Sequence, residues 1–209
     1  MLIDANRYDL LEELILAEPL RHGQPVVLID GRSGAGKTTL ANTLICHHAD
    51  WQLVHADDLY PGWSGLSAVW DLRDLVARRR YRRWDWYQNR FDDEVILNAN
   101  RPLVIEGCGV LTPTNAPLAS LRVWCEVSAP LRRHRALARD PEFRDQWAMW
   151  AVQEGLPVAR RRPADLAALS ISCAPPPADQ ITRYLTTSAA TMANSNKAIR
   201  GHVCADLPA

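Results

Sequence analysis

One short segment of the chain has the residue types and spacing of a phosphate-binding loop. Residues 31–38 read GRSGAGKT and fit the pattern GxxxxGK[ST] without adjustment. Glycines let such a loop turn tightly, so that backbone N–H groups point inward, and the N-terminus of a following helix adds positive potential. We expect Lys37 to reach the β- and γ-phosphates and the Thr38 hydroxyl to face Mg²⁺. The predicted nucleoside triphosphate contacts are Gly31, Ser33, Gly34, Ala35, Gly36, Lys37, Thr38 and Thr39.

The pattern around this loop is that of an α/β protein. The continuous apolar run 25–30 predicts a buried strand before the loop, and residues 38–48 predict a helix after it, which argues against an ordinary glycine turn. Further strands are predicted over 52–56, 102–107 and 122–127, with a weaker candidate at 164–172. Further helices are predicted over 8–18, after Ser67, after Ser128, and from Asp140 to about Glu154, closed by Gly155. This alternation implies a mostly parallel five-stranded sheet with helices on both faces.

The length of 209 residues suits one α/β domain and is too short for two. We expect a single domain over 1–188 with a helical lid at about 140–163. Residues 189–209, where Ala, Ser, Thr and Asn dominate, predict a flexible tail.

Charge balance and apolar patterning exclude several classes of function. Twenty-four basic and 24 acidic residues give a formal net charge of zero, so no long-range field favours nucleic acid or an anionic membrane. No apolar run approaches the roughly 18–20 residues of a membrane helix, and the start lacks signal-peptide character. We expect a cytoplasmic protein with a small-molecule partner, and homo-oligomerisation stays open. Cys46, Cys108 and Cys125 lie among apolar neighbours and are predicted to be small buried side chains rather than metal ligands.

A pair of carboxylates follows the predicted strand 52–56. The carboxyl ends of parallel strands form the ligand-binding edge of a sheet, so Asp57 and Asp58 should project near the phosphate loop. A carboxylate there can accept or orient the proton of a substrate hydroxyl that attacks the γ-phosphorus. The alternative is an acidic helix cap or a solvated pair.

Three short motifs resemble the uridine kinase branch of the P-loop nucleoside kinases, a group that includes phosphoribulokinase and bacterial pantothenate kinase. ADDLY at 56–60 resembles a motif in which a strand-end Asp is followed three residues later by Tyr. WDW at 84–86 resembles an aromatic-Asp-aromatic acceptor motif, although tryptophans replace smaller rings. The histidine that follows this motif in the family is absent here, and Asn89 is the residue nearest to its position. RALARD at 135–140 resembles the RxxxRD sequence at the lid entrance. The resemblance covers roughly residues 25–169.

The resemblance implies a role for each matching residue. Asp57 would be the catalytic carboxylate, acting with Lys37 and with the lid arginines Arg135 and Arg139, which would stabilise charge on the transferring phosphoryl group. Arginines on a solvated helix face are the alternative. Glu106 is similar to the acidic residue that closes the family's third core strand, and with Thr38 it would hold Mg²⁺; a helix cap is its alternative. Rigid aromatic rings can stack on a base or pack against a sugar. The acceptor contacts would be Tyr60, Trp63, Trp84, Trp86 and Arg90.

Two classes of function therefore remain open. The first is a kinase that transfers the γ-phosphate of MgATP to a hydroxyl of a nucleoside-like or other small acceptor, with a sugar, a nucleotide monophosphate, a vitamin precursor or a gluconate-like acid as rivals. The second is a nucleotide-binding regulatory or toxin-like protein without metabolite kinase activity. The missing NKxD-type guanine signature favours ATP over GTP.

Overall fold

The structure, a computed structural model, describes residues 24–173. The helix predicted over 8–18, the end of the domain at 188 and the tail over 189–209 lie outside the described residues.

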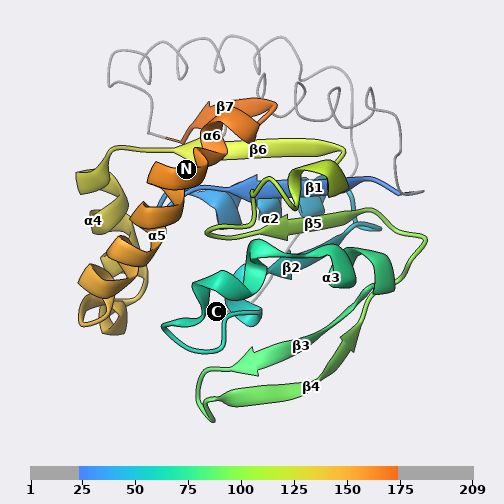
Figure 1. The fold of residues 1–209 in the computed structure, drawn as a ribbon, viewed down its shortest axis with the longest axis horizontal. Coiled ribbons are helices and arrows are strands. Elements are labelled where there is room, and N and C mark those ends of the chain that lie inside the picture. The colour runs from blue at the N-terminus through green and yellow to red at the C-terminus, as the bar shows by residue number, and fades with distance from the viewer. Residues whose placement is uncertain (1–23, 174–209) are drawn as a thin grey trace, which may run out of the picture. The chain divides into compact units, whose positions relative to one another are not determined.

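A five-stranded parallel sheet forms the centre of the fold, in the order β2-β5-β1-β6-β7 (Figure 1). Ile29 of β1 pairs with Glu106 of β5 and with Val123 of β6, so these strands end close to one another at the carboxyl edge of the sheet. The predicted α/β class with a mostly parallel five-stranded sheet is confirmed. The strands are β1 (Val26–Asp30), β2 (Gln52–His55), β5 (Leu103–Glu106), β6 (Leu121–Glu126) and β7 (Leu169–Ser172).

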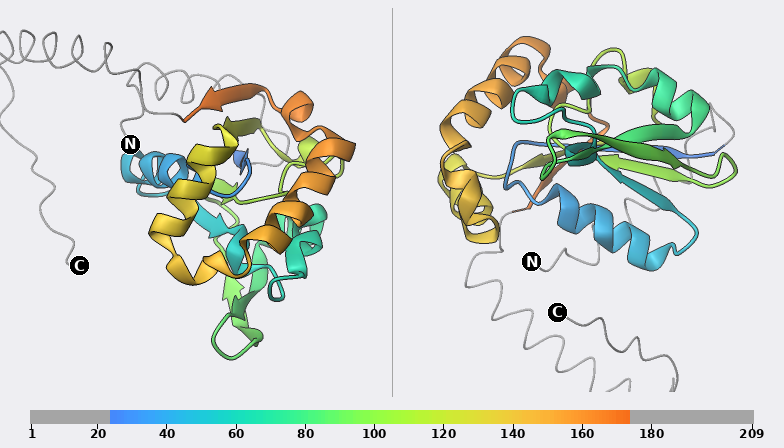
Figure 2. Two further views of the ribbon diagram at one scale, coloured as in Figure 1. Left: turned by 90° about the vertical axis from the view of Figure 1, so that its left-hand side faces the viewer. Right: turned by 90° about the horizontal axis from the view of Figure 1, so that it is seen from below.

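Alternate residues of β1 feed two hydrophobic cores, one on each face of the sheet, because successive side chains of a strand point to opposite sides. Val27 and Ile29 pack with α2 (Lys37–His47) on one face. Val26 and Leu28 pack on the other, which is covered by the 3₁₀ segment Gly65–Trp70 and by α3 (Arg73–Arg78). Figure 2 shows α2 and α3 on opposite sides of the sheet. Burial on both faces explains why β1 is a continuous apolar run.

Beyond the carboxyl edge of the sheet stand α4 (Ala129–Arg139) and α5 (Trp147–Arg161), followed by the short α6 (Pro163–Leu166) (Figure 1). Asp140 caps the 3₁₀ segment Pro141–Arg144 by accepting the N–H groups of Glu142 and Phe143, as its predicted role as a helix cap requires. The prediction that the next helix ends at Gly155 is wrong: α5 continues through Gly155 and Pro157 and ends where Arg162 turns left-handed, with φ of 45°.

An antiparallel hairpin, β3 (Arg80–Asp85) and β4 (Arg90–Ile96), projects beyond the β2 edge of the sheet, as Figure 1 shows. The sequence did not predict it. Asp85 closes its turn by accepting the N–H groups of Tyr87 and Gln88, and Asn89 takes the left-handed conformation that such turns need.

The prediction that three cysteines are buried is confirmed for two of them. Cys108 and Cys125 are buried as predicted, but Cys46 is exposed because it lies on the outer side of α2.

Within residues 24–173, no helix is long and apolar enough to cross a membrane.

Candidate active site

The phosphate loop connects β1 to α2, as predicted, and is held by the base of α4. Gly34 and Gly36 adopt φ values of 78° and 99°, which favour glycine, and a Cβ on Gly34 would overlap the backbone of Arg132. The buried Arg132 guanidinium donates to the carbonyl oxygens of Val127 (3.2 Å) and Ser33 (3.3 Å). Arg132 is therefore a structural support of the loop, a role that its place on an arginine-rich helix face did not reveal.

A cavity of about 260 Å³ opens on the concave side of the loop. Two predicted contacts lie elsewhere: Ala35 is buried beneath α2, and Gly31 packs against Cys125. The cavity is lined by Ser33, Gly34, Gly36, Lys37, Thr38, Thr39, Asp57, Glu106, Cys108, Arg135, Ala136 and Arg139. The loop, the predicted base, the predicted metal carboxylate and both predicted arginines thus meet at one cavity.

Lys37 extends into this cavity with its charge maintained by its neighbours. Its Nζ lies 3.4 Å from the carbonyl oxygen of Arg32 and 3.4 Å from Cys108 Sγ. Burial alone would lower the pKa of Lys37, but Cys108 and the carboxylates, of which Glu106 acts most strongly, outweigh burial and raise the pKa above its ordinary value. The ammonium is therefore charged at neutral pH and suits the binding of a polyphosphate.

Thr38 and Glu106 meet on the other side of the cavity. Thr38 Oγ1 donates to Glu106 Oε1 (3.0 Å), and His55 Nδ1 lies 2.7 Å from the same oxygen. Burial raises the pKa of Glu106, but His55, Lys37 and Thr38 outweigh it, and the pKa lies below its ordinary value; the bond to Glu106 in turn raises the pKa of His55. His55 was not predicted, although it is the last residue of β2 and directly precedes the ADDLY motif.

This donor set fits Mg²⁺ as P-loop proteins hold it. Mg²⁺ usually keeps several waters and takes one or two protein oxygens together with substrate phosphates, and Thr38 and Glu106 offer one hydroxyl and one carboxylate side by side. Within residues 24–173, no group of three or more His, Cys, Asp or Glu could by itself hold a metal ion.

A second cavity, of about 750 Å³, adjoins the first and shares Ser33, Asp57 and Arg139 with it. Asp57 is exposed at the cavity surface, yet the surrounding protein reduces the hydration of its carboxyl and raises the pKa; Glu106 raises it further, and Lys37, Arg139 and His55 only partly offset this. Asp57 therefore lies at the boundary of the two cavities, with a basicity above that of a solvated aspartate. Its place beside the GKT turn is the arrangement that the strand-end argument predicted.

The predicted aromatic acceptor contacts divide into two groups. Trp63 and Trp86 line the second cavity, with ring centroids 5.0 Å apart, and Trp86 Nε1 donates to the Asp57 carbonyl oxygen (3.0 Å). Tyr60 also lines it, but its hydroxyl donates to the Cys108 carbonyl oxygen (2.8 Å). Trp84 and Arg90 are not among the described residues that line the cavity.

Their place in the hairpin explains why these two lie elsewhere. Trp84 packs edge-on against Phe91, with ring centroids 5.0 Å apart, and Arg90 pairs with Asp85 in the register of the strands. Asp58, which the strand-end argument placed beside Asp57, lines the cavity as well. The sequence did not assign several further residues that line it: Tyr87, Asp140, Glu142, Phe143 and Trp150.

The predicted lid arginines have different surroundings. Arg139, the last residue of α4, lines both cavities. Arg135 lines only the first cavity, the one on the phosphate loop, which we call the phosphate cavity. Its Nη1 donates to the Cys173 carbonyl oxygen (2.9 Å). Arg139 is therefore the better placed of the two to contact a group that passes from one cavity to the other.

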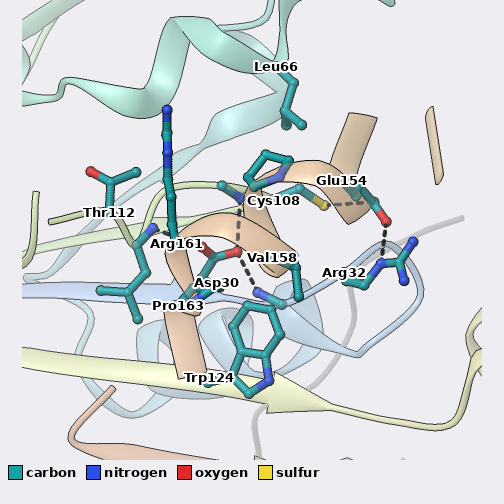
Figure 3. A pocket seen from close by; sticks show the side chains of 14 residues that line it. Asp30, Arg32, Leu66, Cys108, Thr112, Trp124, Glu154, Val158, Arg161 and Pro163 are labelled. Atoms are coloured by element: carbon teal, nitrogen blue, oxygen red, sulfur yellow. Dashed lines mark hydrogen bonds and ion pairs between the residues drawn. The ribbon is translucent and has the colours of Figure 1, made fainter. Parts of the chain in front are cut away.

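Helix α5 reaches the phosphate loop through the buried Glu154. Its carboxylate accepts the Ser33 N–H (2.8 Å), the Ser33 hydroxyl, the Trp150 indole N–H (2.8 Å) and the Cys108 thiol (3.2 Å). Arg32 Nε approaches the other oxygen (3.3 Å), and Figure 3 shows Glu154 between Arg32 and Cys108. The available sequence signal was the shared helix face of Trp147, Trp150 and Glu154.

A second buried carboxylate, Asp30, ends β1 directly before the loop. It accepts the backbone N–H groups of Gly31 (2.6 Å), Gly109 (2.9 Å) and Leu111 (2.8 Å), and so joins the phosphate loop to the segment after β5 (Figure 3). Burial raises the pKa of Asp30 to about 6, against the lowering effect of these hydrogen bonds.

No protein-family model matches the sequence, and no curated protein matches it. Solved structures do. A possible uridine kinase from Bacillus stearothermophilus is 19% identical, with a TM-score of 0.53, over 79% of this chain and 97% of that one. A "putative fructose transport system kinase" from Silicibacter sp. TM1040 is 20% identical, with a TM-score of 0.51, over 82% of this chain and 99% of the other. At these identities the likeness concerns the fold, and the chain has the fold of the P-loop kinases.

Proposed function

We propose that the chain is an ATP-dependent kinase that transfers the γ-phosphate to a hydroxyl group of a small molecule. One observation carries the proposal: Asp57 lies where a cavity built on the phosphate loop adjoins a second, aromatic cavity. A protein that only binds nucleotide has no need of a second cavity or of a carboxylate at its boundary.

The proposal gives each side of this boundary a role. The loop N–H groups and Lys37 bind the triphosphate, with its terminal phosphate toward Asp57 and Arg139. An acceptor in the second cavity presents its hydroxyl to Asp57, which takes the proton as the oxygen bonds to phosphorus. The bond between the γ-phosphorus and the bridging oxygen breaks, and ADP leaves with the electron pair.

Two further groups support the transfer. Arg139 faces the charge that spreads over the transferring phosphoryl group, and Arg135 lines the same cavity. Thr38 and Glu106 would hold Mg²⁺, which when bound neutralises charge on the β- and γ-phosphates. An acceptor with a nucleoside-like flat ring and hydroxyl is the finer form of the proposal, supported by the resemblance of the ADDLY and WDW segments to the uridine kinase branch, which does not specify the charge of the acceptor.

The test is Asp57→Asn, which keeps the shape of the side chain and removes its basicity. Acceptor-dependent ADP release should fall at least ~10²-fold, whereas the affinity for a non-hydrolysable ATP analogue should change little. Asp93→Asn is the matched control. It makes the same change of carboxylate to carboxamide at an exposed position on β4 and should retain full activity. Full activity in Asp57→Asn, or ADP release that no acceptor increases, would contradict the proposal and favour a nucleotide-binding regulator.

A further inference from the structure

We infer that the acceptor is a hydroxyl-bearing organic cation, a protonated or quaternary amine on an aromatic or apolar body. The inference rests on the proposed function, because it takes the second cavity to be the acceptor site. It names a class that the fold alone does not specify.

Charge is divided unequally between the two cavities. The second cavity is lined by four carboxylates, Asp57, Asp58, Asp140 and Glu142, and by one guanidinium, that of Arg139. Arg139 also faces the phosphate cavity, where Lys37 and Arg135 provide further positive charge. Because the chain as a whole has 24 basic and 24 acidic residues, this division is local. The phosphate cavity is also lined by the carboxylates of Asp57 and Glu106, so there three cationic groups face two carboxylates. Cationic groups are thus in excess where a triphosphate would bind, and carboxylates are in excess where the acceptor would bind.

The four carboxylates of the second cavity differ in the partners they already have. No group of three or more His, Cys, Asp or Glu in the described part of the chain is close enough to hold a metal ion. Asp140 already caps the segment that follows it. Asp57 lines the phosphate cavity as well, and the proposed function assigns it to the reacting hydroxyl. Asp58 also interacts electrostatically with His55 and Arg83, neither of which lines the cavity. Within the cavity, Asp58 and Glu142 are the carboxylates left to balance a positive charge carried by the acceptor.

Aromatic rings form the rest of the wall. Trp63 lies at their centre: it stacks on Phe143 (5.3 Å, 12°) and meets Trp86 (5.0 Å, 60°) and Trp150 (6.0 Å, 83°). Tyr60 and Tyr87 line the same cavity. Ring faces attract ammonium groups through their electron density, and differently inclined rings can surround one. They also favour an apolar or aromatic body.

Together these features select against anions. A sugar acid or a nucleotide monophosphate would place its negative charge among carboxylates, and of the described residues that line the cavity only Arg139, shared with the triphosphate, could balance it. An amine-bearing alcohol would instead find carboxylates and ring faces. Of the acceptor classes left open by the sequence, the anionic ones are therefore disfavoured.

A matched set of three alcohols tests the inference. 2-Amino-1-phenylethanol, 1-phenyl-1,2-ethanediol and mandelate share a phenyl ring and a benzylic hydroxyl, and at pH 7 they are cationic, neutral and anionic. Binding is followed by quenching of tryptophan fluorescence, with Mg²⁺ and a non-hydrolysable ATP analogue present. The affinity for the amine should be at least about 10-fold higher than the affinity for the diol, and mandelate should bind most weakly.

The double variant Asp58→Asn/Glu142→Gln shows whether the carboxylates cause this order. Its preference for the amine over the diol should fall roughly tenfold, because two partly exposed ion pairs are lost. Asp93→Asn/Asp145→Asn is the control: it removes the same charge from exposed positions that do not line the cavity, and its preference should be unchanged.

Equal or tighter binding of the diol or of mandelate, no saturable binding of the amine, or an unchanged preference in Asp58→Asn/Glu142→Gln would overturn the inference. Because this readout needs no turnover, it is independent of the proposed kinase activity, which stands or falls with Asp57→Asn. Acceptor-dependent ADP release that only neutral or anionic alcohols support would also overturn the inference, and would leave the kinase proposal in place.

Discussion

Replacement of Glu154 by alanine should destabilise the protein by about 3–5 kcal/mol and weaken the binding of an ATP analogue. Glu154 is only 3% exposed, and its carboxylate joins α5 to the phosphate loop through Ser33, Trp150, Cys108 and Arg32. Few other side chains in the described part of the chain accept hydrogen bonds from so many groups at once.

The magnitude follows from the groups that lose a partner. A buried donor left unpaired costs about 1–3 kcal/mol, and alanine would leave the Ser33 N–H in that position. The Trp150 indole keeps an alternative, because its Nε1 also lies 3.0 Å from Ser33 Oγ. Loss of the carboxylate near Lys37 and Arg32 adds the cost of uncompensated positive charge. Glutamine retains one acceptor oxygen, so Glu154→Gln should cost only about 1–2 kcal/mol.

The assay is urea unfolding of the full chain, followed by tryptophan fluorescence, with the affinity for an ATP analogue as a second readout. Val152→Ala is the control, since Val152 lies on the same helix and is 63% exposed, and it should change the free energy of unfolding by about 0.5 kcal/mol or less. We expect the analogue to bind at least ~10-fold more weakly to Glu154→Ala, because the loop loses its support. A tenfold loss of affinity corresponds to about 1.4 kcal/mol of binding free energy. If Glu154→Ala were no less stable than Val152→Ala, the tethering role would be refuted.

Two further predictions concern the base of the phosphate loop. Gly34→Ala should weaken binding of the ATP analogue by ~10-fold or more in calorimetry, because φ is 78° and the new Cβ would overlap Arg132. Gly155→Ala, whose new Cβ would lie 3.9 Å from Arg32 Nη2 in ordinary van der Waals contact, should instead stabilise by about 0.5–1 kcal/mol. Asp30 has a folded-state pKa of about 6, above the ordinary 3.8, so its contribution to stability is greatest below pH ~4 and is lost as pH rises to about 6. Urea midpoints measured from pH 4 to 7 should show this loss, up to ~3 kcal/mol, in the wild type relative to Asp30→Asn, and equal pH profiles would contradict it.

The parts of the fold that the sequence predicted are those in which local pattern and tertiary environment agree. β1 is buried on both faces, so its residues form an uninterrupted apolar run that ends at the glycines of the loop. The positions of Asp57 and Glu106 could be predicted from the topology, since parallel strands bring their carboxyl ends to one edge of the sheet. Once the strands are predicted, these side chains must lie close to the loop, and they do.

The hairpin could not be predicted in this way because most of its surface is exposed. β3 reads RYRRWD, in which only Tyr81, Trp84 and Asp85 are partly buried, so no two-residue apolar period marks it as a strand. The WDW segment crosses the end of β3, and a register shift separates Arg82 from Trp84. A motif spacing therefore could not show that Trp86 would line the cavity while Trp84 packs against Phe91 within the hairpin.

Helix α5 shows a different limit, where contacts distant in sequence override local signals. Gly155 and Pro157 favour an end at Glu154, yet the helix continues for seven more residues to Arg161. It is fixed at two points: Glu154 contacts the phosphate loop, and the Arg161 guanidinium lies 3.8 Å from the centre of the Trp70 ring. Both partners lie more than 80 residues away in the sequence, so no window of neighbouring residues contains them. The same contacts that lengthen α5 place Trp150 in the wall of the second cavity, so the shape of that cavity depends on interactions that only the folded chain reveals.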